Sequence, residues 1–280
     1  MGSVDEARAK AAATYNAASD CYDDPANSFW ERFGRRTIDR LDLTPGAHVL
    51  DVCCGSGASA IPAAEAVGPN GSVIAVDLAD ELLTLARIKA SRRGLTNIDF
   101  LTANMLDLQL PQADFDFVVC VFGIFFVPDM EAATRELWRW VRPGGKLAIT
   151  TWGRGFFEPM NTVFWNSVRD VRADLYKGFH PWDRLSDPDL VRSMLARAGA
   201  ETEDVVLEPG THLLRAPEDW WKMILGSGYR GTVEQLDDQS REYVRQTNLE
   251  FIATSGLTSV EANVIYATAT KSRPKNPGSV

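Results

Sequence analysis

Cysteine and histidine are scarce in this chain. Its 280 residues include four cysteines and three histidines. The cysteines are spaced too unevenly for a disulfide framework, so we expect reduced thiols. Cys53 and Cys54 are adjacent and have no paired Cys-x-x-Cys partner elsewhere, which argues against the usual zinc-binding spacings. We therefore expect no metal site.

Excess positive charge and long apolar runs are also absent. The formal net charge is −9, which makes binding to a phosphate backbone unfavourable and argues against a nucleic-acid partner. The longest apolar stretch, Val118 to Val127, is far shorter than the ~20 residues of a membrane span. The N-terminus shows no signal-peptide pattern. We expect a cytoplasmic protein without membrane insertion, and the sequence does not indicate its oligomeric state.

What the sequence does contain is a nucleoside-binding pattern between residues 48 and 77. A strand-type apolar run, a Gly-rich turn and an Ala-rich helix-type segment follow one another. Gly55 and Gly57 allow a tight turn and a close approach of ligand to backbone, and the new helix directs its free N–H groups at that ligand. A second strand-type run ends in Asp77, a carboxylate suited to accept hydrogen bonds from a ribose diol.

The identity of the nucleoside is less obvious, because Gly55-x-Gly57-x-x-Ala60 also satisfies the relaxed dinucleotide fingerprint. Asp51 argues against that interpretation: a carboxylate beside the turn repels a pyrophosphate and attracts an ammonium or sulfonium. S-adenosylmethionine carries both cations. An NAD(P)-dependent oxidoreductase is the alternative, disfavoured further by the lack of a separate Tyr-x-x-x-Lys pattern. A non-catalytic protein that binds an adenosyl ligand is also compatible with the sequence.

These motifs resemble those of the class I S-adenosylmethionine-dependent methyltransferases. Val49 to Gly57 resembles their first motif, and Val73 to Asp77 resembles the second. The resemblance extends over roughly residues 30 to 152 in consistent order, and the Cys-Cys-Gly-Ser-Gly turn is similar to that of the quinone-biosynthesis C-methyltransferases. Further matches are Asn104-Met105 at the adenine position, Phe115 to Cys120 at the fourth strand, and Val141 to Leu147 before the fifth strand.

Strands that alternate with helices predict a doubly wound parallel α/β sheet. The resemblance implies a Rossmann-like, mixed seven-stranded sheet whose last strand is antiparallel, with a helical N-terminal lid and a helical cap insertion. We predict closing strands over Thr202 to Leu214 and Ser259 to Thr270, with helices over Pro217 to Leu225 and Thr232 to Thr254 between them. The expected parts of one domain, 1–280, are a lid with the first helix (1–42), the cofactor-binding core (43–152), the cap insertion (153–198), the closing elements (199–271) and a tail (272–280).

The resemblance implies S-adenosylmethionine as the cofactor, with Asp77 on the ribose and Asp51 near the methionine ammonium. The predicted cofactor-binding residues are Asp51, Cys53, Gly55, Ser56, Gly57, Asp77, Leu78, Asn104, Met105, Val121 and Phe122.

Methyl transfer requires an acceptor held in line with the methyl carbon and shielded from water. The acceptor then lies beyond the fourth and fifth strands, where an aromatic-rich stretch favours a bulky, apolar or aromatic small molecule, methylated on oxygen or carbon. The same rings could instead form the core of the cap. The predicted acceptor-binding residues are Tyr15, Tyr22, Phe125, Trp152 and Phe157. His180, the only histidine in the predicted cap, is the candidate general base.

Overall fold

The computed structural model describes residues 4–200 and 202–273, so most of the predicted tail over 272–280 lies outside the described residues. Within the described residues, the chain forms a seven-stranded sheet in the order β3-β2-β1-β4-β5-β9-β6 and a small ladder of β7 and β8. Strands β1 to β5 pair in parallel, and β9 is antiparallel to both β5 and β6. The predicted fold class is confirmed. The strands are β1 (His48–Val52), β2 (Ser72–Asp77), β3 (Ile98–Thr102), β4 (Phe115–Val121), β5 (Val141–Trp152), β6 (Thr202–Glu208), β7 (Thr211–Leu213), β8 (Ser259–Glu261) and β9 (Val264–Thr270).

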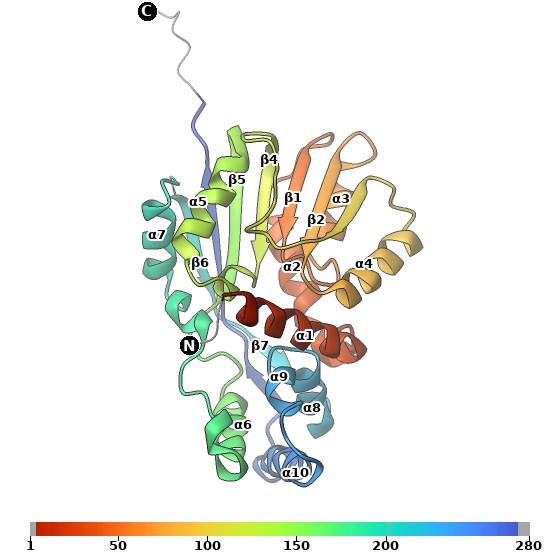
Figure 1. The fold of residues 1–280 in the computed structure, drawn as a ribbon, viewed down its shortest axis with the longest axis vertical. Helices are drawn as coiled ribbons and strands as arrows, with labels where there is room; N and C mark the ends of the chain where they lie inside the picture. The colour runs from red at the N-terminus through yellow and green to blue at the C-terminus, as the bar shows by residue number, and fades with distance from the viewer. Residues whose placement is uncertain (1–3, 201, 274–280) are drawn as a thin grey trace, which may run out of the picture.

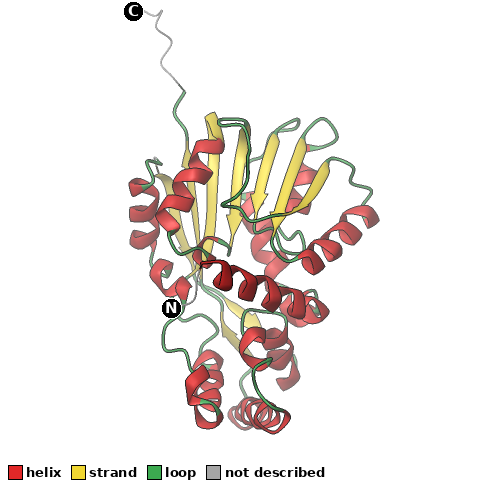
Figure 2. Ribbon diagram, viewed as in Figure 1, coloured by secondary structure: helices red, strands yellow, loops and turns green. Residues whose placement is uncertain are grey.

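The central strands are apolar because helices cover both faces of the sheet (Figures 1 and 2). Every residue of β4 is buried, including Asp116. That carboxylate accepts a hydrogen bond from the backbone N–H of His48, at 2.9 Å, and pairs with Arg142. These partners explain how an acidic residue is accommodated in a central strand.

The helices divide into a sheet-covering set and a cap. Helix α3 contacts both α2 and α4, and these three pack over β1 to β4, whereas α5 and α7 contact one another and pack over β4, β5, β6 and β9. Helix α6 packs on α10, and α10 packs on α8, which together form the cap at the lower end of Figure 1. The helices are α1 (Val4–Tyr22), α2 (Phe29–Asp39), α3 (Ala60–Val67), α4 (Asp80–Arg92), α5 (Met130–Trp140), α6 (Met160–Val171), α7 (Pro188–Arg197), α8 (Pro217–Leu225), α9 (Arg230–Val233) and α10 (Asp238–Ser255).

Helix α1 crosses the carboxyl ends of the strands between the sheet and the cap (Figure 1). It contacts α4 on the sheet side and α8 and α9 on the cap side. The cap itself comes from two separate stretches of chain, because α6 belongs to the predicted insertion whereas α8, α9 and α10 come from the closing region. The structure therefore brings the N-terminal segment and both cap stretches to the edge of the sheet where ligands bind in such folds.

Three predicted elements over the closing region are wrong in their extent. The strand expected over 202–214 breaks at Pro209-Gly210, and the strand expected over 259–270 breaks at Ala262-Asn263. In each case the shorter part leaves the main sheet, and the two short parts pair as β7 and β8. The helix expected over 232–254 is two helices, because Asp237 caps a new one by accepting a hydrogen bond from the Ser240 N–H at 2.8 Å.

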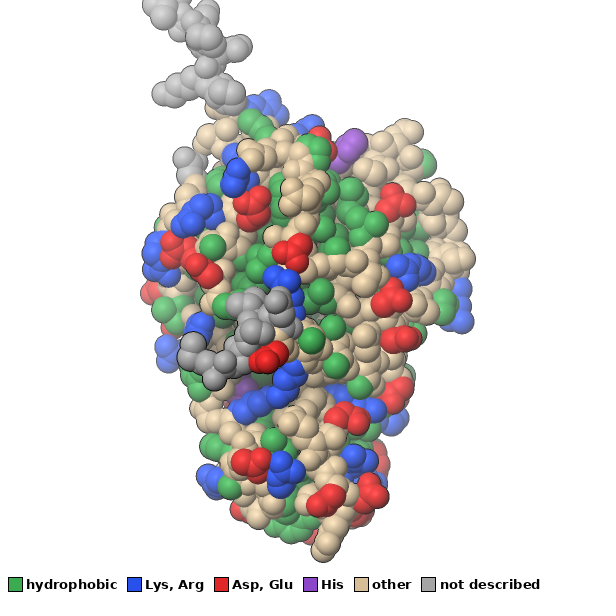
Figure 3. Space-filling model, in the orientation of Figure 1, with side chains coloured by type: hydrophobic (Ala, Val, Ile, Leu, Met, Phe, Trp, Pro, Cys, Tyr) green, Lys and Arg blue, Asp and Glu red, His purple; other side chains and the backbone are tan. Residues whose placement is uncertain are grey.

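The surface carries both signs of charge. On the face drawn in Figure 3, Lys and Arg side chains are interspersed with Asp and Glu side chains. Within the described ranges, no helix is both long enough and apolar enough to cross a bilayer.

Candidate functional site

Asp77 ends β2 in a position fixed by the backbone around it. Its Oδ2 accepts a hydrogen bond from the Gly55 N–H at 2.8 Å, and its Oδ1 accepts one from the Ala79 N–H at 2.9 Å. Burial raises the pKa of Asp77, and these N–H donors offset part of the rise. Each carboxylate oxygen has a second lone pair, so Asp77 can accept further hydrogen bonds from a ligand.

A cleft with two connected parts lies along the carboxyl ends of the strands. Its larger part encloses about 740 Å³, including the portion open to solvent, and the adjoining part about 530 Å³. The residues shared by the two parts are Ala11, Cys53, Asp77, Leu78 and Phe126.

The smaller part of the cleft is suited to a flat heterocycle. Asn104 and Met105 line it beyond the end of β3. The Met105 Sδ lies 3.7 Å from the Cys53 Sγ, and the Asn104 amide is held by Asp107 at 2.9 Å. Because Asp77 lies between this part and the larger one, a nucleoside with its base beside Met105 would have its ribose near the carboxylate.

Asp51 lies behind the glycine turn with one oxygen unused. The carboxylate is 1% exposed, and its Oδ2 accepts a hydrogen bond from the Ser59 Oγ at 2.6 Å. Its Oδ1 is buried without a hydrogen-bond partner among the described residues. Burial raises the pKa of Asp51 to about 7, the Ser59 hydrogen bond opposes the rise, and the charge of Asp77 adds to it. An orphaned buried carboxylate oxygen fits a cationic ligand group such as an ammonium, and it does not fit a pyrophosphate.

The larger part of the cleft has aromatic walls from three places in the chain. Tyr15 and Tyr22 come from α1, Trp30 comes from α2, and Phe122 and Phe126 follow β4. The Tyr22 ring stacks on Trp30 with ring centres 5.3 Å apart, and the Tyr15 ring meets Phe126 edge-on at 5.5 Å. Burial raises the pKa of both tyrosines, so both hydroxyls stay protonated at neutral pH.

The glycine at position 55 is required by this packing. Its φ is +54°, and a Cβ there would lie 2.9 Å from the Tyr22 hydroxyl oxygen. Cys53 and Phe122 also have positive φ values, 58° and 52°, at the ends of β1 and β4. Left-handed backbone at non-glycine residues is uncommon and concentrates at ligand sites, and both residues line the cleft.

Comparison with known proteins identifies the family. The ubiE/COQ5 methyltransferase family matches residues 4–171, which include α1, the glycine turn and both parts of the cleft. The chain belongs to the ubiE/COQ5 methyltransferase family. The resemblance to S-adenosylmethionine-dependent methyltransferases is thereby confirmed, and S-adenosylmethionine is confirmed as the cofactor. Asp77, which lines the cleft, and Asp51, whose orphaned oxygen lies behind the glycine turn, have the chemistry to hold the ribose and the ammonium of that cofactor.

Individual ubiE/COQ5 relatives are similar over part of their length. A demethylmenaquinone methyltransferase from Listeria monocytogenes is 35% identical over 117 residues, which are 42% of this chain and 49% of the relative. Nocamycin O-methyltransferase from Saccharothrix syringae is 34% identical over 129 residues, 46% of each chain. The chain thus spans about half the length of these relatives. A SAM-dependent methyltransferase structure from Aquifex aeolicus has a TM-score of 0.53 and 25% identity, covering 68% of this chain and 91% of its own.

Most of the predicted site residues of this ubiE/COQ5 chain lie at the cleft. Three cofactor candidates lie behind its surface: Asp51, Gly57 and Ser56, the last with its hydroxyl 2.6 Å from Asp23 Oδ1. The predicted residues that line one or both parts are Tyr15, Tyr22, Cys53, Gly55, Asp77, Leu78, Asn104, Met105, Val121 and Phe122.

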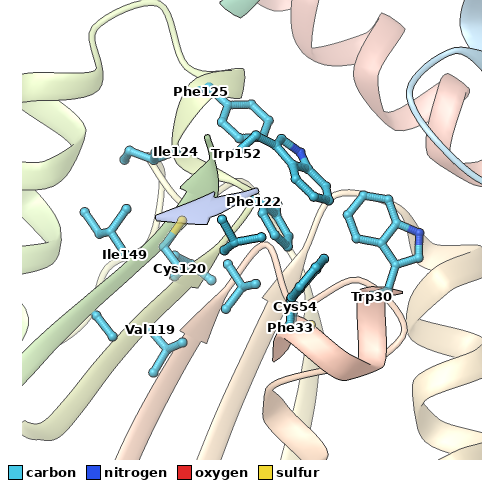
Figure 4. Close-up of a cluster of buried hydrophobic side chains, with 14 of the residues drawn as sticks. Trp30, Phe33, Cys54, Val119, Cys120, Phe122, Ile124, Phe125, Ile149 and Trp152 are labelled. Carbon is cyan, nitrogen blue, oxygen red and sulfur yellow. The ribbon is translucent and has the colours of Figure 1, made fainter. Parts of the chain in front are cut away.

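Three predicted acceptor-binding residues, Phe125, Trp152 and Phe157, lie behind the cleft wall. Figure 4 shows Phe125 and Trp152 within a buried cluster that includes Phe122 and Trp30. The Trp152 ring stacks beneath Phe122 with ring centres 4.0 Å apart, and Phe157 is 0% exposed. The larger part of the cleft ends at Phe122 and Phe126. These three rings therefore belong to the buried core, which is the alternative that the sequence left open.

His180 lies apart from the cleft. It lines a different cavity, in the cap, with its ring stacked on Trp182 at a centre distance of 4.5 Å. Burial lowers the pKa of His180 to about 4. A histidine in this place does not reach an acceptor in the cleft, so the geometry does not support it as the general base.

Sequence reasoning did not select Trp30 and Phe126 as site residues, although both line the cleft. Trp30 falls within the apolar pattern of a helix, which usually marks core. Phe125 and Phe126 are adjacent in sequence, yet Phe125 is 3% exposed and Phe126 is 40% exposed. The two side chains point in different directions because they lie in a short helical turn, Ile124–Phe126, which no sequence pattern predicts.

Proposed function

We propose that this chain transfers a methyl group from S-adenosylmethionine to a neutral, bulky, apolar or aromatic small molecule. The observation that carries the proposal is the continuity of the cleft: its Asp77 and Met105 part suits a nucleoside, and its tyrosine, tryptophan and phenylalanine part suits an apolar acceptor. A single small-molecule cleft with both surfaces places two reactants side by side.

The charge of the cleft supports a neutral acceptor. Among the described residues that line the larger part, Asp77 is the only Asp, Glu, Lys, Arg or His. Its tyrosines are protonated; the hydrogen bond with Cys120 and burial raise the pKa of Cys53, and burial raises the pKa of Cys54. No cationic side chain there would compensate a phosphate or carboxylate on the acceptor.

The residues of the chain would act by binding and orientation. When bound, S-adenosylmethionine supplies an electrophilic methyl group. Asp77 and Asp51 would hold the ribose and the ammonium, Tyr15 and Tyr22 would close the cleft from α1, and Trp30, Phe122 and Phe126 would hold the acceptor and exclude water. Because no histidine or lysine lines the described cleft, the proton that the acceptor loses would pass to solvent, which requires an acidic reacting group such as a phenol or an enolisable carbon.

The names of the relatives are consistent with both kinds of acceptor. The Listeria relative is a demethylmenaquinone methyltransferase, and the Saccharothrix relative is an O-methyltransferase for nocamycin. We propose an acceptor of either type, a ring carbon of a hydroxylated aromatic or the oxygen of an acidic hydroxyl. The position of the methyl group in the product then distinguishes methylation on carbon from methylation on oxygen.

An acceptor screen tests the proposal. The full chain is incubated with S-adenosylmethionine and neutral dihydroxynaphthalenes, or with their monophosphates, which keep one free hydroxyl, and S-adenosylhomocysteine and methylated product are measured by mass spectrometry. We expect turnover of neutral compounds and at least about tenfold less of the phosphates, the penalty for leaving one charge without a partner. Equal or preferred turnover of the phosphates would contradict the proposed acceptor class.

A further inference from the structure

A second cavity lies in the cap and shares none of its lining residues with the cleft. It encloses about 670 Å³, including the portion open to solvent. Two chains of aromatic rings separate it from the cleft: Phe156, Trp152 and Phe122, with centres 4.5 and 4.0 Å apart, and Trp182, Phe125 and Phe126, at 5.8 and 5.0 Å. The cavity is therefore a separate space behind an aromatic wall.

The floor of this cap cavity is built from flat rings. The His180 ring lies parallel to Trp182, with an angle of 2° between the planes, and its centre is 5.1 Å from that of Trp165. Phe156 packs on Trp182 at 5.2 Å, and Tyr176 lies at the exposed rim. A planar aromatic ligand matches such a surface, because offset stacking and edge contacts add to the burial of apolar area.

Several polar groups of the cavity are not used by the fold. No hydrogen bond or ion pair to a described residue is present for the Asn166 amide or for the Lys177 ammonium, which lies 5.4 Å above the Trp165 ring. Both carboxylates of the cavity accept hydrogen bonds from neighbouring residues. Glu158 accepts hydrogen bonds from Asn161 and from both the N–H and the hydroxyl of Thr162.

The second carboxylate, Asp183, accepts a hydrogen bond from the His180 N–H at 2.7 Å through Oδ2 and keeps Oδ1 available. The cavity thus offers one cation without a carboxylate partner, Lys177, and one free carboxylate oxygen. A ligand with an acidic group at one end and a hydroxyl donor at the other would satisfy both.

We propose that the cap cavity is a second small-molecule site, which binds a hydroxylated aromatic carboxylate between the rings of Trp165, Tyr176 and Trp182. The carboxylate pairs with Lys177 at the rim, and the hydroxyl donates to Asp183. The His180 ring, stacked on Trp182, forms part of the aromatic surface of this site. The proposal goes beyond methyl transfer and does not depend on it, because the cavity and the cleft have separate linings.

Calorimetry with 6-hydroxy-2-naphthoate and the full chain tests the second site. We expect one binding event whose affinity is unchanged, within about twofold, when S-adenosylhomocysteine is present in excess. Lys177→Met should weaken binding of the naphthoate at least about tenfold, as expected for loss of a charge-assisted hydrogen bond, and Lys177 is exposed, so the variant should fold. 2-Naphthol lacks the carboxylate and is also a candidate ligand of the cleft, so its affinity should be the same in wild type and Lys177→Met.

The matched control is Arg192→Met, which removes one positive charge from the exposed face of α7, away from the cavity. It should leave the affinity for the naphthoate unchanged. The proposal is overturned if the folded wild-type chain does not bind the naphthoate, if Lys177→Met binds it as tightly as wild type, or if Lys177→Met weakens 2-naphthol as much as the naphthoate. Displacement of the naphthoate by S-adenosylhomocysteine would assign the probe to the cleft and would also overturn it.

Discussion

Asp51, which we propose to hold the ammonium of the cofactor, lowers the stability of the folded protein when no ligand is bound. Its carboxylate is fully buried, one oxygen lacks a partner among the described residues, and its pKa is raised to about 7 from 3.8. The folded state therefore holds a proton that the unfolded state loses, between about pH 4 and pH 7. Across that window the stability decreases as the pH rises, and the cost of ionised Asp51 is complete above pH 7.

We predict that Asp51→Asn removes this pH-dependent cost. The difference in melting temperature between the variant and wild type, measured without cofactor, should become more positive by at least about 2 °C from pH 5 to pH 8. Asp99→Asn, at an exposed position of β3, is the control and should follow wild type at both pH values. A difference for Asp51→Asn that stays constant with pH would show that Asp51 does not titrate as described.

The variants Trp152→Ala and Phe126→Ala separate core from cleft. Trp152 is 2% exposed and packs against six aromatic rings, so its truncation should destabilise the fold by about 3–5 kcal/mol in chemical denaturation. Phe126 is 40% exposed and lines both parts of the cleft. Its truncation should change stability much less while raising KM for the acceptor at least about threefold. If the two variants behaved in the reverse way, the assignment of cleft wall and core would be wrong.

At the scale of elements, a polar cluster fixes the end of α1 to the cofactor turn. Ser56 Oγ donates to Asp23 Oδ1 at 2.6 Å, and the Lys89 Nζ donates to the same Asp23 oxygen at 3.0 Å and to Ser56 Oγ at 2.9 Å. The cluster thus joins α1, the glycine turn and α4. Tyr22 precedes Asp23, and its hydroxyl lies over Gly55, so the cluster sets the position of a cleft wall.

We predict that Lys89→Met increases the dissociation rate of S-adenosylmethionine by about threefold to tenfold, because the lid is held less firmly over the turn. Stopped-flow displacement measures this rate, and Lys89→Arg should restore part of the effect. The control is Arg92→Met on the exposed side of the same helix. Dissociation that is equally fast in wild type and Lys89→Met would show that the cluster supports the fold alone.

The elements that the sequence predicted well are those determined by residues close together in the chain. The strand, turn and helix from β1 to α3 follow from apolar runs and glycines a few residues apart, and Asp77 follows directly from the end of β2. The breaks at Pro209-Gly210 and Ala262-Asn263 depend on β7 finding β8, a pairing between distant segments. The wall of the cleft likewise depends on Tyr15 meeting Phe126 across α1 and β4, which no local pattern encodes.

At the scale of the whole molecule, the cleft is closed by parts that are far apart in the chain. Helix α1 touches α8 and α9, the Trp30 Nε1–H donates to the Gly226 carbonyl at 3.2 Å, and Asn27 donates to the Lys222 carbonyl at 3.0 Å. The aromatic composition of the cap was visible in the sequence. The sequence did not show which of these rings line the cleft, because Trp152 and Phe157 differ from Trp30 and Phe126 only in how the assembled cap and sheet bury them.

The central claim is that this cleft binds S-adenosylmethionine with Asp77 on the ribose. Isothermal titration of the cofactor into wild type, Asp77→Ala and the exposed control Asp99→Ala tests it, with NAD titrated in parallel. We predict that wild type and Asp99→Ala bind S-adenosylmethionine equally, that Asp77→Ala binds it at least about tenfold more weakly, and that NAD gives no binding heat. Wild-type affinity in a folded Asp77→Ala protein, or tighter binding of NAD than of S-adenosylmethionine, would contradict the account.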